Sequence, residues 1–482
     1  MDPQLENDLL EREAAELVEL IAVRRVSSRE LTRAHLERIE EVNGRINAIV
    51  TVDPEAAMQA AAQADEAIAT GERTGPLHGL PMTHKDTHAT AGMRTTQGSP
   101  LFAEHVPEAD DPLIGRLKAA GVVSTGKSNV PEFAAGSHTF NEVFGATGNP
   151  YDPSTSAGGS SGGLGAALAA RIQPLGEGSD MGGSLRIPSS YCNVYGFRPS
   201  YGVIPSFPPS HRAAWLARQG PMARTVRDLQ LFMRSACGPS DALPGVRSMS
   251  PADFADASAE DLRGVRIGVT YDFGQGVPVE PEMVAAVDRA AATLEELGAQ
   301  VQEAVPDLTG ADEVFFVTRA FDFAATLGET VRRHPEQVKP EVRWNVEEGF
   351  ALDAGRLIRA QAASAALQDS VQRYFGGYDL LLSPGAQLPP FGIGQRWPEE
   401  VAGQPIETYL DWMRSASLLS ATGLPTLAMP AGFTGPEEAR PGLPTGVQLT
   451  AGHYADGSLL WWARAYDRAS GWSSTAPGML RS

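Results

Sequence analysis

Lysine, cysteine and long apolar runs are all scarce in this chain of 482 residues. Two cysteines, Cys192 and Cys237, cannot form a disulfide framework, and no N-terminal apolar run resembles a signal peptide or a membrane-spanning helix. We therefore expect a cytoplasmic protein. The chain has 39 Lys and Arg residues and 59 Asp and Glu residues. The resulting net charge of −20 repels nucleic acid and anionic lipid. Neither is an expected partner.

The four lysines stand at positions 85, 118, 127 and 339, so arginine carries nearly all of the positive charge. A buried lysine can lose its proton, whereas a guanidinium group effectively cannot. Keeping a lysine of ordinary pKa neutral at pH 7 costs about 4.6 kcal/mol. A lysine that serves as a base must therefore be enclosed.

Periodicity indicates an α/β fold. Ser27 and Glu30 form a capping box, which predicts the start of a helix. Helical periodicity predicts helices near 17–23, 28–42, 54–71, 280–297, 406–421 and 457–468. Alternation predicts strands near 265–269, 301–305, 380–382, 426–429 and 446–450. The strand–helix–strand order at 265–305 implies parallel pairing, and no linker divides the chain. We expect one domain over 1–482, with N-terminal helices in 1–74, a core carrying the site in 75–230, and a variable middle region and C-terminal part of the sheet in 231–482.

Three short sequence patterns typical of other enzyme classes occur in the chain, but their neighbouring residues do not fit those classes. Gly121–Ser128 fits the Walker A pattern, but apolar strand residues fall inside the would-be phosphate loop. Ser124 and Lys127 form an S-x-x-K pair that lacks its partner segments. His84 and His88 have the spacing of a zinc helix, but a lysine occupies the position of the catalytic Glu. We therefore expect neither a nucleotide site nor a metal site.

Ser160 lies at the centre of a G-x-S-x-G sequence, which is typical of the nucleophile in α/β-hydrolases. No downstream histidine stands in a context that marks the base of such a triad. Where no histidine serves, a lysine kept neutral by burial can deprotonate a hydroxyl. Lys85, Ser160 and Ser184 form such a set, although the glycine-rich segments around the serines could also be plain turns. Glycines such as Gly182 and Gly183 allow backbone amides to converge on an oxyanion.

The segments that contain these residues resemble the amidase signature family. The matching sequences are GLPMTHKD, TTQGSPLF, GKSNVPEFA, GNPYDPSTSAGGSSGG, GSDMGGSLRIPSSYCNVYGFRPSYG, QGPMARTVRDL, LLLSPG, ATGLPTLAMPAG and GLPTGVQLTAG. They span nearly the whole chain. The spacings from Lys85 to Ser160 and from Ser160 to Ser184 also agree with the family. The resemblance implies an α/β fold with a central mixed, mostly parallel twisted sheet covered by helices.

The resemblance also implies the roles of individual residues. Ser184 occupies the position of the nucleophile, Ser160 that of the bridging serine after a cis peptide bond from Gly159, and Lys85 that of the base. The implied oxyanion hole consists of the backbone amides of Met181, Gly182, Gly183 and Ser184. The implied supporting positions are Gly159, Ser161, Asp180 and Arg186. No metal or organic cofactor is implied. Two positions depart from the family pattern: Gly148 replaces a common Arg, and Glu177 is interpreted either as an exposed strand-end carboxylate or as a buried one that tunes the site.

These observations predict hydrolysis of an amide C–N bond through an acyl-enzyme on Ser184. We expect an amidase or aryl acylamidase that takes an apolar or aryl small-molecule amide, with side activity on esters or carbamates. Aromatic-rich stretches at 207–215 and 315–323 indicate either a substrate pocket or part of the core. The candidate pocket residues are Phe133, Ile187, Tyr191, Phe316 and Trp344. The alternative is the glutaminase (A) subunit of a tRNA-dependent amidotransferase, for which Ile187 beside the nucleophile is too apolar. A catalytically silent binding protein is disfavoured because Lys85, Ser160 and Ser184 are all present. Since related enzymes are often dimers, the resemblance also implies a possible homodimer.

Overall fold

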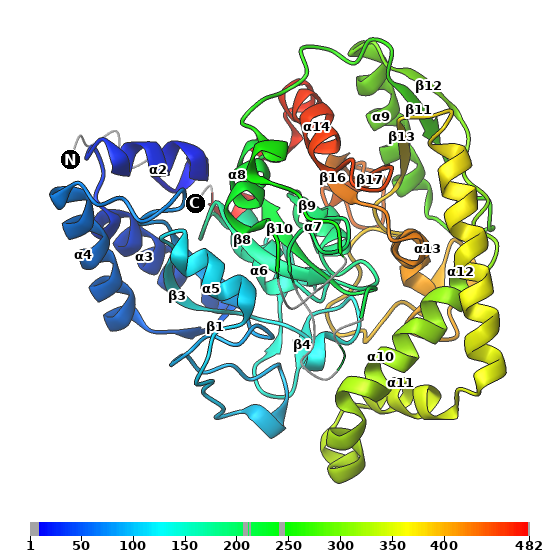
Figure 1. Cartoon of the computed structure of the whole chain (residues 1–482), viewed down its shortest axis with the longest axis horizontal. Coiled ribbons are helices and arrows are strands. Elements are labelled where there is room, and N and C mark those ends of the chain that lie inside the picture. Colours follow the sequence, from blue (N-terminus) through cyan, green and yellow to red (C-terminus); the bar gives the residue numbers. More distant parts are fainter. Residues whose placement is uncertain (1–8, 206–210, 212–213, 241–245, 481–482) are drawn as a thin grey trace.

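The computed structural model describes residues 9–205, 211, 214–240 and 246–480. Its N-terminal helices α2 (Ala14–Ala22), α3 (Ser28–Ile46) and α4 (Pro54–Thr70) agree with the prediction and lie at one end of the molecule (Figure 1). The capping box is present, because Glu30 N–H donates to the Ser27 side chain and Ser27 N–H donates to Glu30 Oε2. The small sheet has the order β1 (Ile49–Val52), β3 (Val123–Ser128) and β2 (Pro81–Lys85). The Walker A match thus folds as strand β3 instead of a phosphate loop.

A mixed sheet of eight strands forms the centre of the molecule. Its order is β12 (Gln300–Glu303), β11 (Arg266–Val269), β13 (Leu380–Pro384), β17 (Pro444–Ala451), β16 (Thr426–Phe433), β9 (Tyr195–Arg198), β10 (Arg218–Ala223) and β8 (Leu175–Asp180). Strand β11 pairs in parallel with β12 and β13, and the other pairs are antiparallel. The mixed sheet is confirmed, but its description as mostly parallel is wrong. Strand–helix–strand crossovers produce the parallel pairs, whereas β16 and β17 follow each other through a short connection.

Helices cover both faces of this sheet. One face carries α9 (Pro281–Glu296), α8 (Val226–Ala236) and α14 (Asp456–Ser470), and the other carries α6 (Gly162–Ala169), α7 (Arg186–Cys192) and α13 (Arg414–Thr422). Strand β13 shows why both layers are needed. Leu380 and Leu382 belong to the core beneath α9 and α14, while Leu381 belongs to the core beneath α7 and α13. Complete burial of each such side chain is worth about 1.5–3 kcal/mol.

Two differences from the predicted elements have local causes. The helix predicted at 406–421 begins only at Arg414, because Asp411 accepts hydrogen bonds from the backbone and the hydroxyl of Thr408 and holds a turn there. Periodicity did not predict α10 (Ala311–Arg333), α11 (Pro340–Ala351) and α12 (Ala354–Tyr374), which lie opposite the N-terminal helices (Figure 1).

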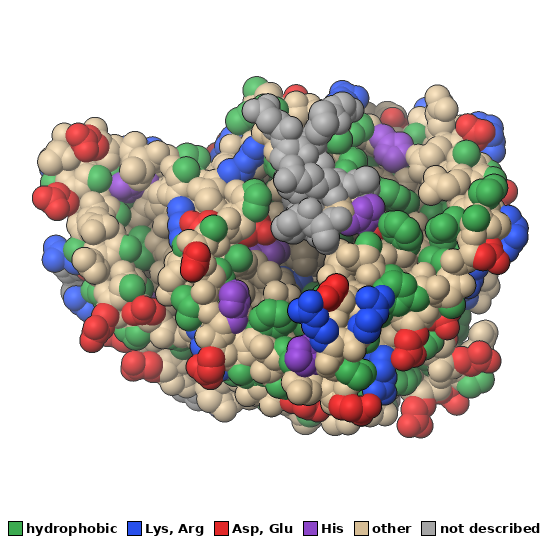
Figure 2. All heavy atoms as spheres, turned by 60° about the horizontal axis from the view of Figure 1, so that its bottom comes forward, with side chains coloured by type: hydrophobic (Ala, Val, Ile, Leu, Met, Phe, Trp, Pro, Cys, Tyr) green, Lys and Arg blue, Asp and Glu red, His purple; other side chains and the backbone are tan. Residues whose placement is uncertain are grey.

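Among the described residues, no helix combines the length and apolar character needed to cross a membrane. Charged side chains of both signs are interspersed over the face shown in Figure 2.

Candidate active site

A cavity of about 370 Å³ lies between the carboxyl end of β8 and helix α10. One wall contains Ser160, Ser179, Met181 and Ser184, and the opposite wall contains Arg319, Asp322 and Phe323. Ser160 is fully buried, whereas Ser184 is 8% exposed. The cavity therefore gives a small molecule access to Ser184. Ser160 lines the same wall but is more deeply buried.

Lys85 is the last residue of β2 and is fully buried. Its Nζ lies 2.8 Å from Ser160 Oγ, 2.9 Å from Ser161 Oγ and 2.9 Å from Ser179 Oγ. Burial lowers the pKa of Lys85 to about 7, because desolvation disfavours the ammonium form. A substantial fraction of Lys85 is then neutral near pH 7, which is the state that a base requires.

The loops that carry the two serines are tied together through the backbone. Ser161 N–H donates to the carbonyl oxygen of Ser184 at 3.1 Å, and the Gly159–Ser160 peptide bond is cis. A Cβ atom on Gly159 would lie 2.9 Å from the backbone N of His138, so only glycine fits at this position. The glycine-rich sequence around Ser160 is thus explained by close packing.

Asp180 and Arg186 clamp the turn that carries Ser184. Arg186 donates from Nε and Nη2 to the two oxygens of Asp180 at 3.0 and 2.9 Å, and both side chains are fully buried. Burial alone would raise the pKa of Asp180, but the ion pair with Arg186 holds it well below its usual range. Asp180 Oδ1 also accepts the Gly183 N–H at 2.9 Å. This bond corrects one prediction: the Gly183 amide is engaged inside the clamp and is not free for an oxyanion.

Glu177 is fully buried, so its interpretation as an exposed strand-end carboxylate is wrong. Its side chain points from β8 toward β2, where Oε1 accepts the Lys85 N–H at 2.7 Å and Oε2 contacts Nδ1 of His88. Burial would raise the pKa of Glu177, but His88 and His84 beside it lower the pKa to about 2. The carboxylate is therefore ionised and lies directly behind Lys85.

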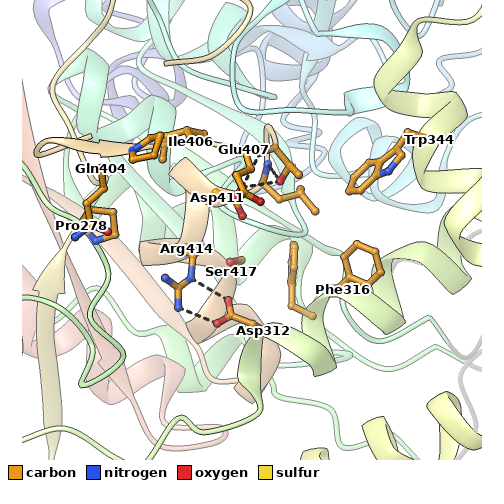
Figure 3. Close-up of a pocket in the computed structure, with 14 residues that line it drawn as sticks. Pro278, Asp312, Phe316, Trp344, Gln404, Ile406, Glu407, Asp411, Arg414 and Ser417 are labelled. Atoms are coloured by element: carbon orange, nitrogen blue, oxygen red, sulfur yellow. Dashed lines mark hydrogen bonds and ion pairs between the residues drawn. The ribbon is translucent and has the colours of Figure 1, made fainter. Parts of the chain in front are cut away.

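Of the five predicted pocket residues, only Phe133 lines the cavity that contains Ser184. Phe316 and Trp344 line a second cavity of about 460 Å³, in which Asp312 and Arg414 form an ion pair (Figure 3). Ile187 and Tyr191 lie on α7 and are fully buried in the core against α13, so they cannot contact a substrate. These four assignments are corrected. Within the stretch 207–215, positions 207–210 and 212–213 lie outside the described residues.

Arg319, Asp322 and Phe323 form the second wall of the Ser184 cavity; they lie within the predicted pocket stretch 315–323, although none of them is among the five candidate residues. Their spacing of three and four residues places them on one face of α10, a signal that was available in the sequence. Arg319 is 3% exposed and donates to Asn345 Oδ1 at 3.0 Å and Tyr409 Oη at 2.6 Å. Its third contact is the thioether sulfur of Met181, a weak acceptor. Arg319 therefore keeps donor capacity toward the cavity.

A buried lysine behind two serines is the geometry of a hydrolase with a hydroxyl nucleophile. No cluster of metal-binding side chains occurs among the described residues. A family model described as Amidase matches residues 30–460, and the chain belongs to this family. It is an amidase, a hydrolase of amide C–N bonds.

Two relatives of similar identity have different roles. The chain is 34% identical to an acylamidase of Rhodococcus erythropolis, over 96% of each chain. It is equally similar, at 34% identity over 96% of this chain and 98% of the relative, to the (A) subunit of the glutamyl-tRNA(Gln) amidotransferase of Moorella thermoacetica. The crystal structure of a bacterial aryl acylamidase of the amidase signature family superimposes with a TM-score of 0.88 at 27% identity, covering 96% of this chain and 97% of that chain.

Proposed function

We propose that this amidase forms an acyl-enzyme on Ser184, with Ser160 and Lys85 as its proton relay. The observation that supports this proposal is the buried Nζ of Lys85, which lies 2.8 Å from the hydroxyl of Ser160 in the wall that also presents Ser184. Burial keeps Lys85 partly neutral, so its lone pair can accept a proton from Ser160.

The cycle begins when Ser160 passes its proton to Lys85 and takes the proton of Ser184. Ser184 Oγ attacks the amide carbon, and the carbonyl oxygen becomes an oxyanion. Ser160 then donates its proton to the leaving nitrogen, which departs as a neutral amine, while Lys85 returns the proton to Ser160. Water releases the acyl group through the same relay in the reverse direction.

The oxyanion is stabilised by backbone amides of the turn before α7. The Gly183 amide is bonded to Asp180, so the proposed donors are the amides of Met181, Gly182 and Ser184. A Cβ atom on Gly182 would lie 2.7 Å from Cζ of Phe315, so a larger residue here would displace the turn. Ser161 supports the relay by a hydrogen bond to Lys85.

The proposed substrate is an amide with an apolar or aryl group, with side activity on esters or carbamates. Apolar side chains of Phe133, Met181, Phe323 and Leu327 line much of the cavity, which favours such a group. The acylamidase relatives support the same substrate class. We further propose a homodimer in the cytoplasm.

One observation favours a second candidate, the glutaminase subunit of an amidotransferase with partner subunits. Arg319 and Asp322 bring one positive and one acidic side chain into the cavity, and such a pair could hold the carboxylate and ammonium groups of a free amino acid. The relative from Moorella thermoacetica supports this candidate.

A substrate panel tests both candidates. The purified protein is assayed with 4-nitroacetanilide, benzamide, glutamine and an aryl carbamate, beside Ser184→Ala, Ser160→Ala and Lys85→Ala. We expect faster turnover of the aryl amides than of glutamine, no turnover by Ser184→Ala, and steep losses in the other two variants. Equal or faster turnover of glutamine would select the second candidate. An active Ser184→Ala combined with an inactive Ser160→Ala would make Ser160 the nucleophile.

A further inference from the structure

The proposed relay leaves one buried charged group without a role, the carboxylate of Glu177. Glu177 and Ser179 are two residues apart on β8, so their side chains lie on the same face of this strand. Ser179 Oγ contacts Lys85 Nζ at 2.9 Å, and Glu177 Oε1 accepts the Lys85 backbone N–H at 2.7 Å. Strand β8 thus contacts both the backbone N–H and the side-chain Nζ of Lys85.

The charge of Glu177 creates a difficulty for a lysine that has to be neutral. An anion behind Lys85 stabilises the ammonium form and raises the pKa of Lys85, opposing the effect of burial. His88 contacts the other carboxylate oxygen, and its side chain is only 6% exposed. This contact places the imidazole of His88 against the carboxylate, where it offsets the negative charge, and His88 is the strongest of the groups that lower the pKa of Glu177.

We propose that Glu177 is a positioning residue for Lys85, and that His88, through its contact with the carboxylate, offsets the charge of Glu177 so that Lys85 can give up its proton. This inference rests on the proposed function, in which Lys85 is the base. It gives Glu177 a geometric role through the backbone of Lys85 and gives His88 an electrostatic role through Glu177.

Other ionisable groups surround the pair and limit the size of the effect. Burial lowers the pKa of His84, and its Nδ1 lies 3.5 Å from Glu177 Oε1, so this second histidine offsets Glu177 less than His88 does. Lys127 on β3 also interacts with Glu177, and its Nζ donates to the carbonyl oxygen of His88 at 2.6 Å. Its positive charge stays near Glu177 when the side chain of His88 is replaced, which makes the expected shift smaller. The remaining groups are Asp86, Asp110, Asp111, Lys118 and Asp180.

The test compares the acid limb of kcat/KM against pH in three variants, with the fastest substrate of the panel. In His88→Gln the Glu177 anion is unbalanced, so the limb should move to higher pH by about one unit. In Glu177→Gln the anion is absent but the amide oxygen can still accept the Lys85 N–H, so the limb should stay in place or move to lower pH. A further variant, Glu177→Leu, also removes this acceptor and should in addition lower the maximum, because Lys85 is less well positioned. The double variant His88→Gln/Glu177→Gln loses both members of the pair and should return the limb to within a few tenths of a unit of the wild type.

The position of the limb does not depend on the fraction of folded enzyme, so a partly unfolded variant still gives an answer. His35→Gln is the matched control: His35 is buried, bonds Ile172 and Thr125 instead of Glu177, and burial lowers its pKa to about 4, so no charge is lost. Its limb should stay in place. A structural role alone would lower the maximum in every variant without opposite shifts.

A second readout follows Lys85 without any substrate. Because the chain has only four lysines, protein labelled with ¹³C at lysine Cε gives four signals, and Lys85→Ala assigns one of them. The midpoint of that signal should rise in His88→Gln and return in the double variant. Shifts of the same sign in both single variants, or no shift in His88→Gln, would overturn the proposal. Failure of the proposed function would instead show as an active Ser184→Ala enzyme.

Discussion

The two walls of the Ser184 cavity are built in different ways. The wall of β2, β8 and the two serine loops consists of buried polar groups that bond one another, such as Lys85 and Ser160. The wall of α10 presents side chains of mixed chemistry, including Arg319, Asp322 and Phe323, from one helix face. Under the proposed function, the first wall carries the proton relay and the second wall contacts and selects the substrate.

The largest effect should come from the first wall. Replacing Lys85 by Ala removes the proposed base, whose Nζ lies 2.8 Å from the hydroxyl of Ser160. We expect kcat/KM to fall by about 10³-fold or more, and by a similar factor on every substrate of the panel. Ser235→Ala, on α8 away from the cavity, is the control. Losses that differ strongly between substrates would show that Lys85 also takes part in selection.

The pH dependence of the wild-type enzyme should be the next largest effect. Lys85 has a pKa of about 7, and only its neutral form accepts a proton. About half of Lys85 is neutral at pH 7 and about 1% at pH 5, so kcat/KM should fall about 50-fold from pH 7 to pH 5. Steady-state rates on two substrates check this expectation. A limb near pH 10 would show that Lys85 is not desolvated in solution.

Arg319→Leu should change the order of the substrates. A hydrogen bond to a charged donor is worth about 1.5–3 kcal/mol, so the turnover of a substrate with a remote acceptor such as glutamine should fall about 10- to 100-fold. Benzamide, which has no such group, should change much less. Arg332→Leu is the matched control, because Arg332 lies on the same helix against the ring of Phe350 and outside the cavity. An equal loss on both substrates would place Arg319 with the first wall.

The smallest effect should come from the second cavity (Figure 3). Asp312→Asn breaks the ion pair with Arg414, in which the Asp312 side chain is 51% exposed. Exposed pairs contribute about 0.2–1 kcal/mol, so thermal unfolding should shift only slightly. The panel kinetics should stay within about twofold of the wild type. A tenfold loss on the aryl amides would move the substrate site to this second cavity.

The two walls also differ in how well the sequence predicted them. The sequence predicts Lys85, Ser160 and Ser184 together because the segments that carry them resemble the amidase signature family, and the structure places Lys85 Nζ and Ser160 Oγ 2.8 Å apart. The sequence indicates the stretch 315–323 but not Arg319 within it, because long-range packing decides which face of α10 lines the cavity. Phe316 and Trp344 show the same limit: their aromatic character predicts a pocket, but not which one.

The sheet itself repeats this pattern. The periodicity of β11, α9 and β12 predicted a parallel unit, and this prediction is confirmed. It did not predict the antiparallel pairs that join β13, β17, β16, β9, β10 and β8 in the sheet, because strand order depends on contacts between segments far apart in the chain. The interpretation of Glu177 as exposed was wrong for the same reason, since β2 covers a strand end that the sequence alone leaves open.

The backbone link between Ser161 and Ser184, together with the Asp180–Arg186 clamp, has a consequence for how this architecture can change over time. Neither contact uses the hydroxyl of Ser160 or Ser184. A lineage that exchanged both serines for alanine would lose two oxygen atoms and its chemistry, while these contacts that shape the cavity stayed in place. An enzyme and a receptor for the same ligand are therefore close neighbours in sequence space.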